Sequence, residues 1–176
     1  MVETFSANLS VYIHDPNANI TLRGWISQDD DKKIYALVIE IPRSQHEPQG
    51  GYFKEVLIND KAYIVTPPRG GNDPHTCECF NNPYFEYYWW MPDAKMVSQP
   101  EPKTPTLTCW EAKDGRGALT LCLIPNTSTP KFEFTFHIYP RIHYLDYIAY
   151  SAGSTNSTML KVPSECATTI CNNISV

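Results

Sequence analysis

The sequence predicts a mainly antiparallel β protein, and three observations lead to that prediction. Apolar and polar residues alternate with a period of two in several segments, which is the pattern of a strand with one buried face. Neighbouring segments are joined by short turns, which predicts a meander and not a βαβ arrangement. The six cysteines form an even set, which indicates disulfides that reinforce the fold. With 176 residues and no internal repeat, the chain is expected to be one domain, residues 1–176.

The first strands follow from the alternation. Residues 5–13 are apolar on one face and polar on the other, which predicts a half-buried strand with Asn8 on its polar side. Residues 20–26 alternate in the same way, and Trp25 falls outside their core face. Residues 33–41 are apolar on both faces, as expected of a central strand.

Tight turns connect the next segments. Asn59 and Asp60 separate the strands expected at 52–58 and 61–65, and this pair is typical of a two-residue hairpin turn. Residues 66–82 are rich in Pro and Gly, so we expect a loop there, and it carries two of the cysteines.

A second hairpin is expected over residues 107–124. If its turn centres between Gly115 and Arg116, Cys109 and Cys122 lie directly opposite each other. Opposed residues at a non-hydrogen-bonded position have Cα atoms roughly 4.5 Å apart, which is within disulfide range.

Aromatic residues are concentrated in two places. Residues 131–139 alternate, with Phe134 and Phe136 on one face of the expected strand. Residues 84–90 hold six aromatic side chains, and the length of this run does not decide between helix and strand. Such an element cannot bury all of them in its own core. Either half of them lie under a loop or a dimer partner, or they line a ligand cavity or a sticky interface.

Cysteines and glycosylation signals together indicate an oxidising, extracellular setting. A single Asn-x-Ser/Thr sequon is a weak match, but five in 176 residues exceed chance. We therefore expect a secreted glycoprotein whose signal peptide was cleaved or left out of this numbering. The sequon asparagines are Asn8, Asn19, Asn126, Asn156 and Asn173.

The charge balance excludes two classes of partner. The net charge is −5 and the pI is about 5.5, which argues against nucleic acid and against anionic membrane surfaces. No run of 18 apolar residues is present, so no transmembrane segment is expected.

Catalytic and metal motifs find little support, and the protein is not expected to be an enzyme. His137 and His143 are close in sequence, but His137 falls on the polar side of its strand, which favours a surface position. The carboxylates of 29–31 indicate a solvated turn, with a calcium site as the alternative. The cysteines of 77–79 lack a second pair at zinc-site spacing, so structural disulfides are favoured over a metal site.

The order of several landmarks resembles the ependymin-related family of secreted proteins. Each piece is weak alone, and the order and spacing over residues 20–166 carry the resemblance. The matching pieces are Gly24-Trp25-Ile26-Ser27-Gln28-Asp29, Ala62-Tyr63, Cys77 or Cys79, Met91-Pro92-Asp93-Ala94, Trp110, Cys122 and Val162-Pro163-Ser164-Glu165-Cys166.

This resemblance implies a fold like that of the bacterial lipoprotein carrier LolA. The expected architecture is a strongly curved antiparallel sheet, forming a cup or half-barrel, with short helical segments and disulfide staples. The family is described as secreted, glycosylated and often dimeric, so a homo-oligomer or a dimer with a paralogue is expected. Its members bind hydrophobic molecules such as lipids or carotenoid pigments, and calcium binding has also been attributed to it.

The cysteines depart from the family pattern, because an early cysteine is absent and Cys109 and Cys171 look extra. The favoured connectivity is therefore Cys109–Cys122, Cys79–Cys166 and Cys77–Cys171. Cys77 and Cys79 can exchange roles in this scheme.

Three functions remain in competition. The first is a non-catalytic carrier of an extended apolar molecule, a lipid or a carotenoid, held in an aromatic-lined cavity or dimer interface. The others are an extracellular structural or adhesive glycoprotein and, least supported, a secreted enzyme. The residues expected to line the carrier's site are Trp25, Tyr63, Tyr87, Tyr88, Trp89, Trp90, Met91, Trp110, Phe134 and Phe136.

Overall fold

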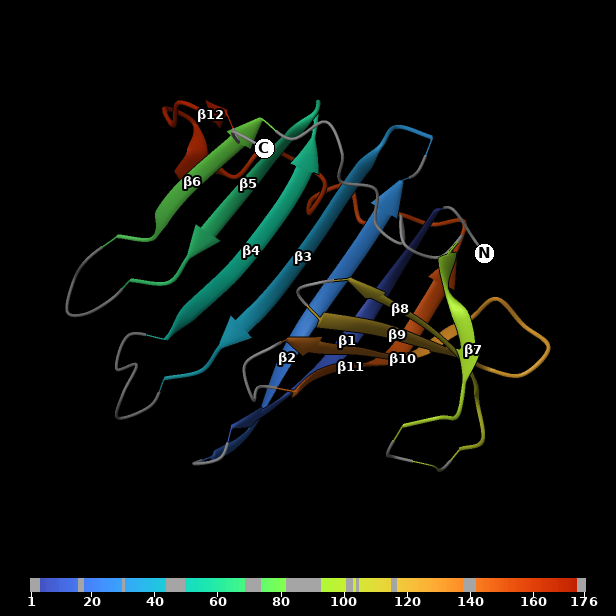
Figure 1. The fold of residues 1–176 in the computed structure, drawn as a ribbon. Coiled ribbons are helices and arrows are strands. Elements are labelled where there is room, and N and C mark those ends of the chain that lie inside the picture. Colours follow the sequence, from blue (N-terminus) through green and yellow to red (C-terminus); the bar gives the residue numbers. More distant parts are fainter. Residues whose placement is uncertain are drawn as a thin grey trace.

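The computed structural model describes residues 4–15, 18–29, 31–43, 50–68, 74–81, 93–100, 103, 105–114, 117–137 and 142–173. Within these ranges the chain is mainly β (Figure 1). The strands are β1 (Thr4–Asp15), β2 (Ala18–Asp29), β3 (Ile34–Ile41), β4 (Gly51–Ile58), β5 (Lys61–Thr66), β6 (Thr76–Asn81), β7 (Lys95–Val97), β8 (Thr108–Asp114), β9 (Gly117–Leu123), β10 (Pro130–His137), β11 (Ile142–Ala152) and β12 (Asn172–Asn173). A 3-10 helix, η2, spans Ser164–Cys166.

One open 12-stranded sheet contains all these strands, in the order β12-β6-β5-β4-β3-β2-β1-β11-β10-β9-β8-β7. Two meanders, β1 to β6 and β7 to β11, are joined where β1 pairs antiparallel with β11. Only β12 runs parallel to its neighbour, β6. The predicted mainly antiparallel meander is therefore confirmed.

The sheet is strongly curved, as predicted. In Figure 1 the β8–β10 end folds across one side of β1 and β2. The part of the chain after β11, residues 153–173, is called the C-terminal segment, and its end with β12 lies behind β5 and β6. We call the side toward which the sheet curls the concave face and the opposite side the convex face. Period-two alternation sends neighbouring residues of every strand to these two faces.

The main core lies on the concave face. Phe5, Leu9 and Val11 of β1 are almost fully buried there, next to Ile26 of β2. Leu121 of β9 belongs to the same cluster, so the two meanders share this core. The buried face predicted for residues 5–13 is confirmed, and so is the outward position of Asn8.

A second core lies on the convex face of β3–β6. Val56, Val65 and Cys79 are fully buried there under the C-terminal segment, which contributes Met159 and Cys166. A third cluster on the convex face of β8–β11 gathers Leu107, Cys109, Cys122, Phe132 and Phe134.

A β-bulge between β1 and β11 adjusts which side chains reach the concave core. Asn8 lies opposite Ala149 while Leu9 lies opposite Tyr147, so Ile148 has no partner and is 62% exposed. The extra residue resets the alternation, as bulges do. As a result Tyr147 and Tyr150, three positions apart, share the concave face.

Both predicted hairpins are present. Asn59 and Asp60 have φ angles of 54° and 57°, the two left-handed positions that a type I′ turn requires. Cys109 lies opposite Cys122 across β8 and β9, with Cα atoms 4.1 Å apart, and the two form the predicted disulfide.

The prediction of a loop over residues 66–82 is wrong for its last part, because Thr76–Asn81 forms strand β6. Its cysteines alternate with Glu78 and Phe80, and the strand pairs with β5 over its full length. The Pro- and Gly-rich composition of the preceding stretch concealed this short strand, whose buried face is defined by Cys79 alone.

Two disulfides attach the C-terminal segment to the convex face of β6. The bonds join Cys77 to Cys166 and Cys79 to Cys171, whereas the favoured pairing had the partners of Cys77 and Cys79 exchanged. Cys77 and Cys79 are two residues apart on one strand, so their side chains share a face and either was within reach of the segment. The order of attachment follows the path of the segment, which passes Cys77 before it pairs with β6.

Candidate functional site

The concave face of β3–β6 carries an apolar surface that the main core does not fully cover. Leu37, Ile39, Phe53, Ile64 and Phe80 are all half-buried there. On the same four strands, the convex face is buried under the C-terminal segment. We call these five residues together with Glu55 the concave wall.

Glu55 is the one carboxylate among these six residues. It lies between Leu37 of β3 and Ile64 of β5, its direct cross-strand neighbours, and it is half-buried. Burial raises the pKa of the Glu55 carboxyl above its usual value, because the charged form loses water. Among the described residues no hydrogen bond or ion pair compensates this carboxyl. Such a group can bind a polar end of an otherwise apolar molecule.

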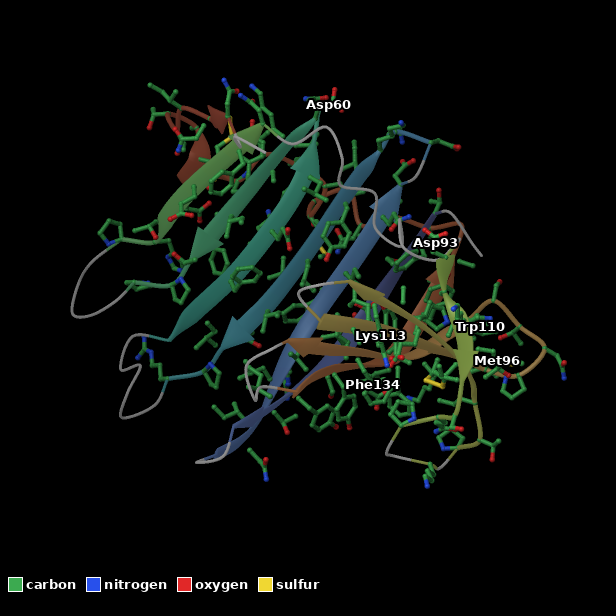
Figure 2. All side chains as sticks on the ribbon, viewed as in Figure 1. Asp60, Asp93, Met96, Trp110, Lys113 and Phe134 are labelled. Atoms are coloured by element: carbon green, nitrogen blue, oxygen red, sulfur yellow. A yellow bond between two sulfur atoms is a disulfide. The ribbon has the colours of Figure 1, made fainter. Side chains whose placement is uncertain are left out.

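The other arm of the sheet adds aromatic surface to the same face. Trp110 of β8 is half-buried and lies between Leu121 of β9 and Met96 of β7. Met96 is 73% exposed at the edge of the sheet. Figure 2 shows Trp110 and Met96 together at this end of the molecule.

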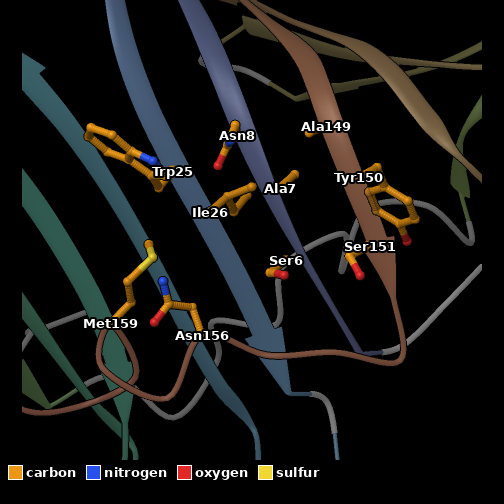
Figure 3. Close-up of a pocket in the computed structure, with 10 residues that line it drawn as sticks. All are labelled: Ser6, Ala7, Asn8, Trp25, Ile26, Ala149, Tyr150, Ser151, Asn156 and Met159. Atoms are coloured by element: carbon orange, nitrogen blue, oxygen red, sulfur yellow. The ribbon is translucent and has the colours of Figure 1, made fainter.

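The convex face carries a separate, shallow pocket of about 210 Å³ (Figure 3). It lies over β1, β2 and β11, next to the bulge. The backbone N–H of Asn156 donates to Ser27 Oγ at 2.9 Å, which holds the start of the C-terminal segment against β2. The pocket is lined by Ser6, Ala7, Asn8, Trp25, Ile26, Ala149, Tyr150, Ser151, Asn156 and Met159.

The four predicted ligand-lining residues whose side chains the structure describes do not share one surface. Trp110 is on the concave face, and Trp25 lines the convex pocket. Tyr63 is buried in the second core, and Phe134, 2% exposed, is buried in the third cluster against Tyr144. Four of the others, Tyr87, Tyr88, Trp89 and Trp90, lie outside the described residues, as do Met91 and the side chain of Phe136.

All five sequon asparagines are exposed. Asn8 and Asn19 lie on the convex faces of β1 and β2, and Asn156 lies beside the convex pocket. Asn126 has a φ of 61° in the turn between β9 and β10, and Asn173 is in β12. The concave wall therefore carries none of the five sequons.

A polar cluster secures the C-terminal segment beside the Cys77–Cys166 disulfide. The Tyr52 hydroxyl donates a hydrogen bond to Glu165, and the Tyr52 ring stacks on His75 with centroids 4.4 Å apart. Burial, and then Glu165, raise the pKa of Tyr52 to about 12. The hydrogen bond from Tyr52 lowers the pKa of Glu165. Tyr52 therefore stays a donor at physiological pH.

The alternative calcium site at 29–31 receives no support from its described members. The Asp29 carboxylate is buried and accepts a hydrogen bond from the ammonium of Lys32, which lowers the pKa of Asp29. Among the residues that the structure describes, no three His, Cys, Asp or Glu side chains gather as metal ligands would. The side chains of His137 and His143 are outside that part of the chain.

Sequence reasoning missed Glu55, although a signal was present. In the strand predicted over 52–58, Glu55 alternates in step with the apolar Phe53 and Leu57, so it must share their face. The structure confirms this, and the neighbouring Lys54 is on the convex face.

Neither a protein-family model nor a curated protein matches this chain. The three disulfides fit an extracellular protein. No helix in the described ranges is long and apolar enough to span a membrane.

Proposed function

We propose that this protein is a secreted, non-catalytic glycoprotein that binds an extended apolar small molecule, a lipid or a carotenoid, on its concave face. The observation that carries the proposal is the concave wall. Its five apolar side chains are half-buried on one side of β3–β6, while the other side of these strands is packed. Burying such a surface against an apolar ligand contributes about 25 cal/mol per Å² before the costs of association.

The distribution of sequons supports the same face. Glycans on Asn8, Asn19 and Asn156 would cover the convex side and leave the concave wall accessible to a ligand. The resemblance to the ependymin-related family points in the same direction, and membership in that family is part of the proposal.

Glu55 narrows the class of ligand. Its desolvated carboxylate would accept a hydrogen bond from a hydroxyl or amine at the polar end of the ligand, between Leu37 and Ile64. A purely hydrocarbon ligand would leave this carboxyl buried without a partner, which costs free energy.

A pair of neighbouring substitutions tests the proposal. Leu37 and Val38 are consecutive on β3, both half-buried, and point to opposite faces. We expect Leu37→Gln to weaken binding of a fluorescent fatty acid or polyene probe about tenfold, because one apolar contact is lost. Val38→Gln should leave the probe's Kd unchanged. Circular dichroism should first show that the wild type and both variants are folded. Equal affinities of these three proteins for the probe would then exclude the concave wall as the binding site.

The second candidate is a structural or adhesive glycoprotein, and one observation favours it. β7 is a three-residue strand at the open edge of the sheet, and it carries the exposed Met96. Open edges can pair with another chain. Concentration-dependent assembly that Met96→Lys abolishes, without any bound small molecule, would support this candidate instead of the carrier.

A further inference from the structure

The convex pocket differs in size and chemistry from the concave wall. Its volume of about 210 Å³ is below the roughly 300–1,000 Å³ of sites for drug-sized ligands. Ser6, Ser151 and Asn156 surround Trp25 and Met159, so polar groups border an aromatic and a thioether surface. This combination fits one sugar ring, whose C–H face is apolar and whose edge carries hydroxyls.

A sugar attachment point lies in the lining itself. Asn8, the acceptor of the first sequon, is exposed on β1 and lies directly opposite Trp25 on β2. Directly opposed residues of antiparallel strands have Cα atoms roughly 4.5–5.5 Å apart, and their side chains leave the sheet on the same side. Figure 3 shows the Asn8 and Trp25 side chains beside each other over the pocket.

We propose that the first N-acetylglucosamine of a glycan on Asn8 occupies the convex pocket and stacks on Trp25. This inference does not depend on ligand binding at the concave wall. It rests on the proposed function only in requiring that the protein is secreted and glycosylated. Trp25 is half-buried and packs on one side against the second core, so it is held in place for a ring on its open side. The attached sugar loses little entropy on reaching it, because the covalent bond already places it there.

Asn156 is the competing sequon at this pocket, and its side-chain oxygen is bonded within its own turn. Its Oδ1 accepts hydrogen bonds from the Thr158 hydroxyl at 2.6 Å and from the Thr158 N–H at 3.2 Å. These bonds engage the amide oxygen and not the nitrogen that would carry a glycan, so the experiment below tests Asn156 as well as Asn8. Asn8 has no such local bond among the described residues, and it is the one paired with Trp25 across the sheet.

A double-mutant cycle tests the proposal on the glycoprotein secreted from eukaryotic cells. Ser10→Ala removes the Asn8 glycan and retains Asn8, and Trp25→Leu removes the ring. We expect Ser10→Ala to raise the unfolding equilibrium constant about two- to twelvefold when Trp25 is present, the range of an aromatic contact. In the Trp25→Leu background the same substitution should have no effect.

Two control variants make the cycle specific. Asn126→Gln removes a glycan in the turn between β9 and β10, and Asn156→Gln removes the competing glycan. The effect of each should be the same in the wild-type background and in the Trp25→Leu background. If the effect of Asn156→Gln depends on Trp25 and that of Ser10→Ala does not, the assignment to Asn8 is overturned.

A second measurement does not depend on the folding of the Trp25→Leu variant. In proton NMR of the intact glycoprotein, the protons of the Asn8-linked sugar should be shifted upfield by the ring current of Trp25. Mass spectrometry of the Asn8 peptide should show occupancy. An unoccupied Asn8, or sugar protons at the positions of a free glycan, would overturn the proposal and leave the concave-wall function untouched.

Discussion

At the residue scale, the two carboxylates Glu55 and Glu165 respond to the fold in opposite ways. Burial among apolar neighbours raises the pKa of Glu55. A hydrogen bond from Tyr52 lowers the pKa of Glu165. The dependence of stability on pH therefore has opposite signs at the two positions.

For Glu55, the folded-state pKa is above the unfolded one, so stability is lost as pH rises through the folded value. Glu55→Gln should therefore make the protein more stable than the wild type at pH 7. The difference should vanish below about pH 4, where Glu55 is protonated in both states. Denaturant unfolding at the two pH values measures this, and a Glu55→Gln protein that is less stable at pH 7 would show that a partner binds the carboxylate.

For Glu165, the folded-state pKa is depressed, so its contribution is present above the unfolded pKa and is lost as pH falls. Tyr52→Phe removes the donor, and we expect it to lower the thermal midpoint at pH 7. The loss should shrink toward acidic pH. Glu78 is an exposed carboxylate on β6, and Glu78→Gln is the control. It should change the thermal midpoint neither at pH 7 nor at acidic pH. A Tyr52→Phe effect that does not depend on pH would show that the hydrogen bond to the Glu165 carboxylate does not account for the loss, because phenylalanine keeps the ring that stacks on His75.

At the element scale, the C-terminal segment is held by two disulfides whose effects on stability should not be additive. Cys77–Cys166 and Cys79–Cys171 span 89 and 92 residues of sequence, but each closes nearly the same loop. With one bridge intact, opening the other releases only a short loop, which costs about 2 kcal/mol. Removing the second should then cost about 4–5 kcal/mol, the value for a long loop.

Unfolding of the Cys→Ala pairs in denaturant checks this expectation. Cys109–Cys122, separated by 13 residues, is the control, and its removal should cost about 3 kcal/mol in any background. Equal costs for each step of the Cys77–Cys166 and Cys79–Cys171 series would mean that the bridges act through local packing and not through chain entropy.

The strands show which parts of the fold can be predicted from the sequence and which cannot. Residues 5–13 could be predicted with their faces, because one apolar face contacts the core and the other contacts solvent. β6 could not, because its packing depends on a segment about 90 residues later in the chain. The same dependence explains Tyr63, which is buried on the convex face only because the C-terminal segment covers it.

Alternation also gives no information about which face of a strand is concave. Phe132 and Phe134 form an apolar row, and Glu133 lies between them as a polar residue would on a solvent face. In the structure Glu133 is 6% exposed on the concave side and accepts a hydrogen bond from Tyr147 at 3.1 Å. The phenylalanines pack in the third cluster instead. Both faces of β10 are therefore buried. The sheet curls over its concave face, and the third cluster, which includes Leu107 and Tyr144, covers its convex face.

At the scale of the whole molecule, the two faces of the sheet have different chemistry. The convex side carries the disulfides, the polar cluster and three of the sequons. The concave side carries the main core and, beyond it, the half-buried wall around Glu55. Both faces therefore stabilise the fold, and the half-buried wall is the part of the concave face that we propose binds the ligand.

Ligand binding should therefore raise the stability of the whole sheet. A ligand that binds only the folded state stabilises it by about 2.7 kcal/mol at a hundredfold excess over Kd. The thermal midpoint should rise with ligand concentration in the wild type and in Val38→Gln, and much less in Leu37→Gln. A rise of equal size in Leu37→Gln would show that the ligand binds away from the concave wall.

The most direct measurement is an absorption spectrum of the natively secreted protein, followed by solvent extraction and mass spectrometry. We predict an apolar molecule with one polar end at near-stoichiometric level, with a visible band that is lost on denaturation if the molecule is a carotenoid. A colourless protein whose extract holds no such molecule would contradict the carrier function and favour the structural glycoprotein.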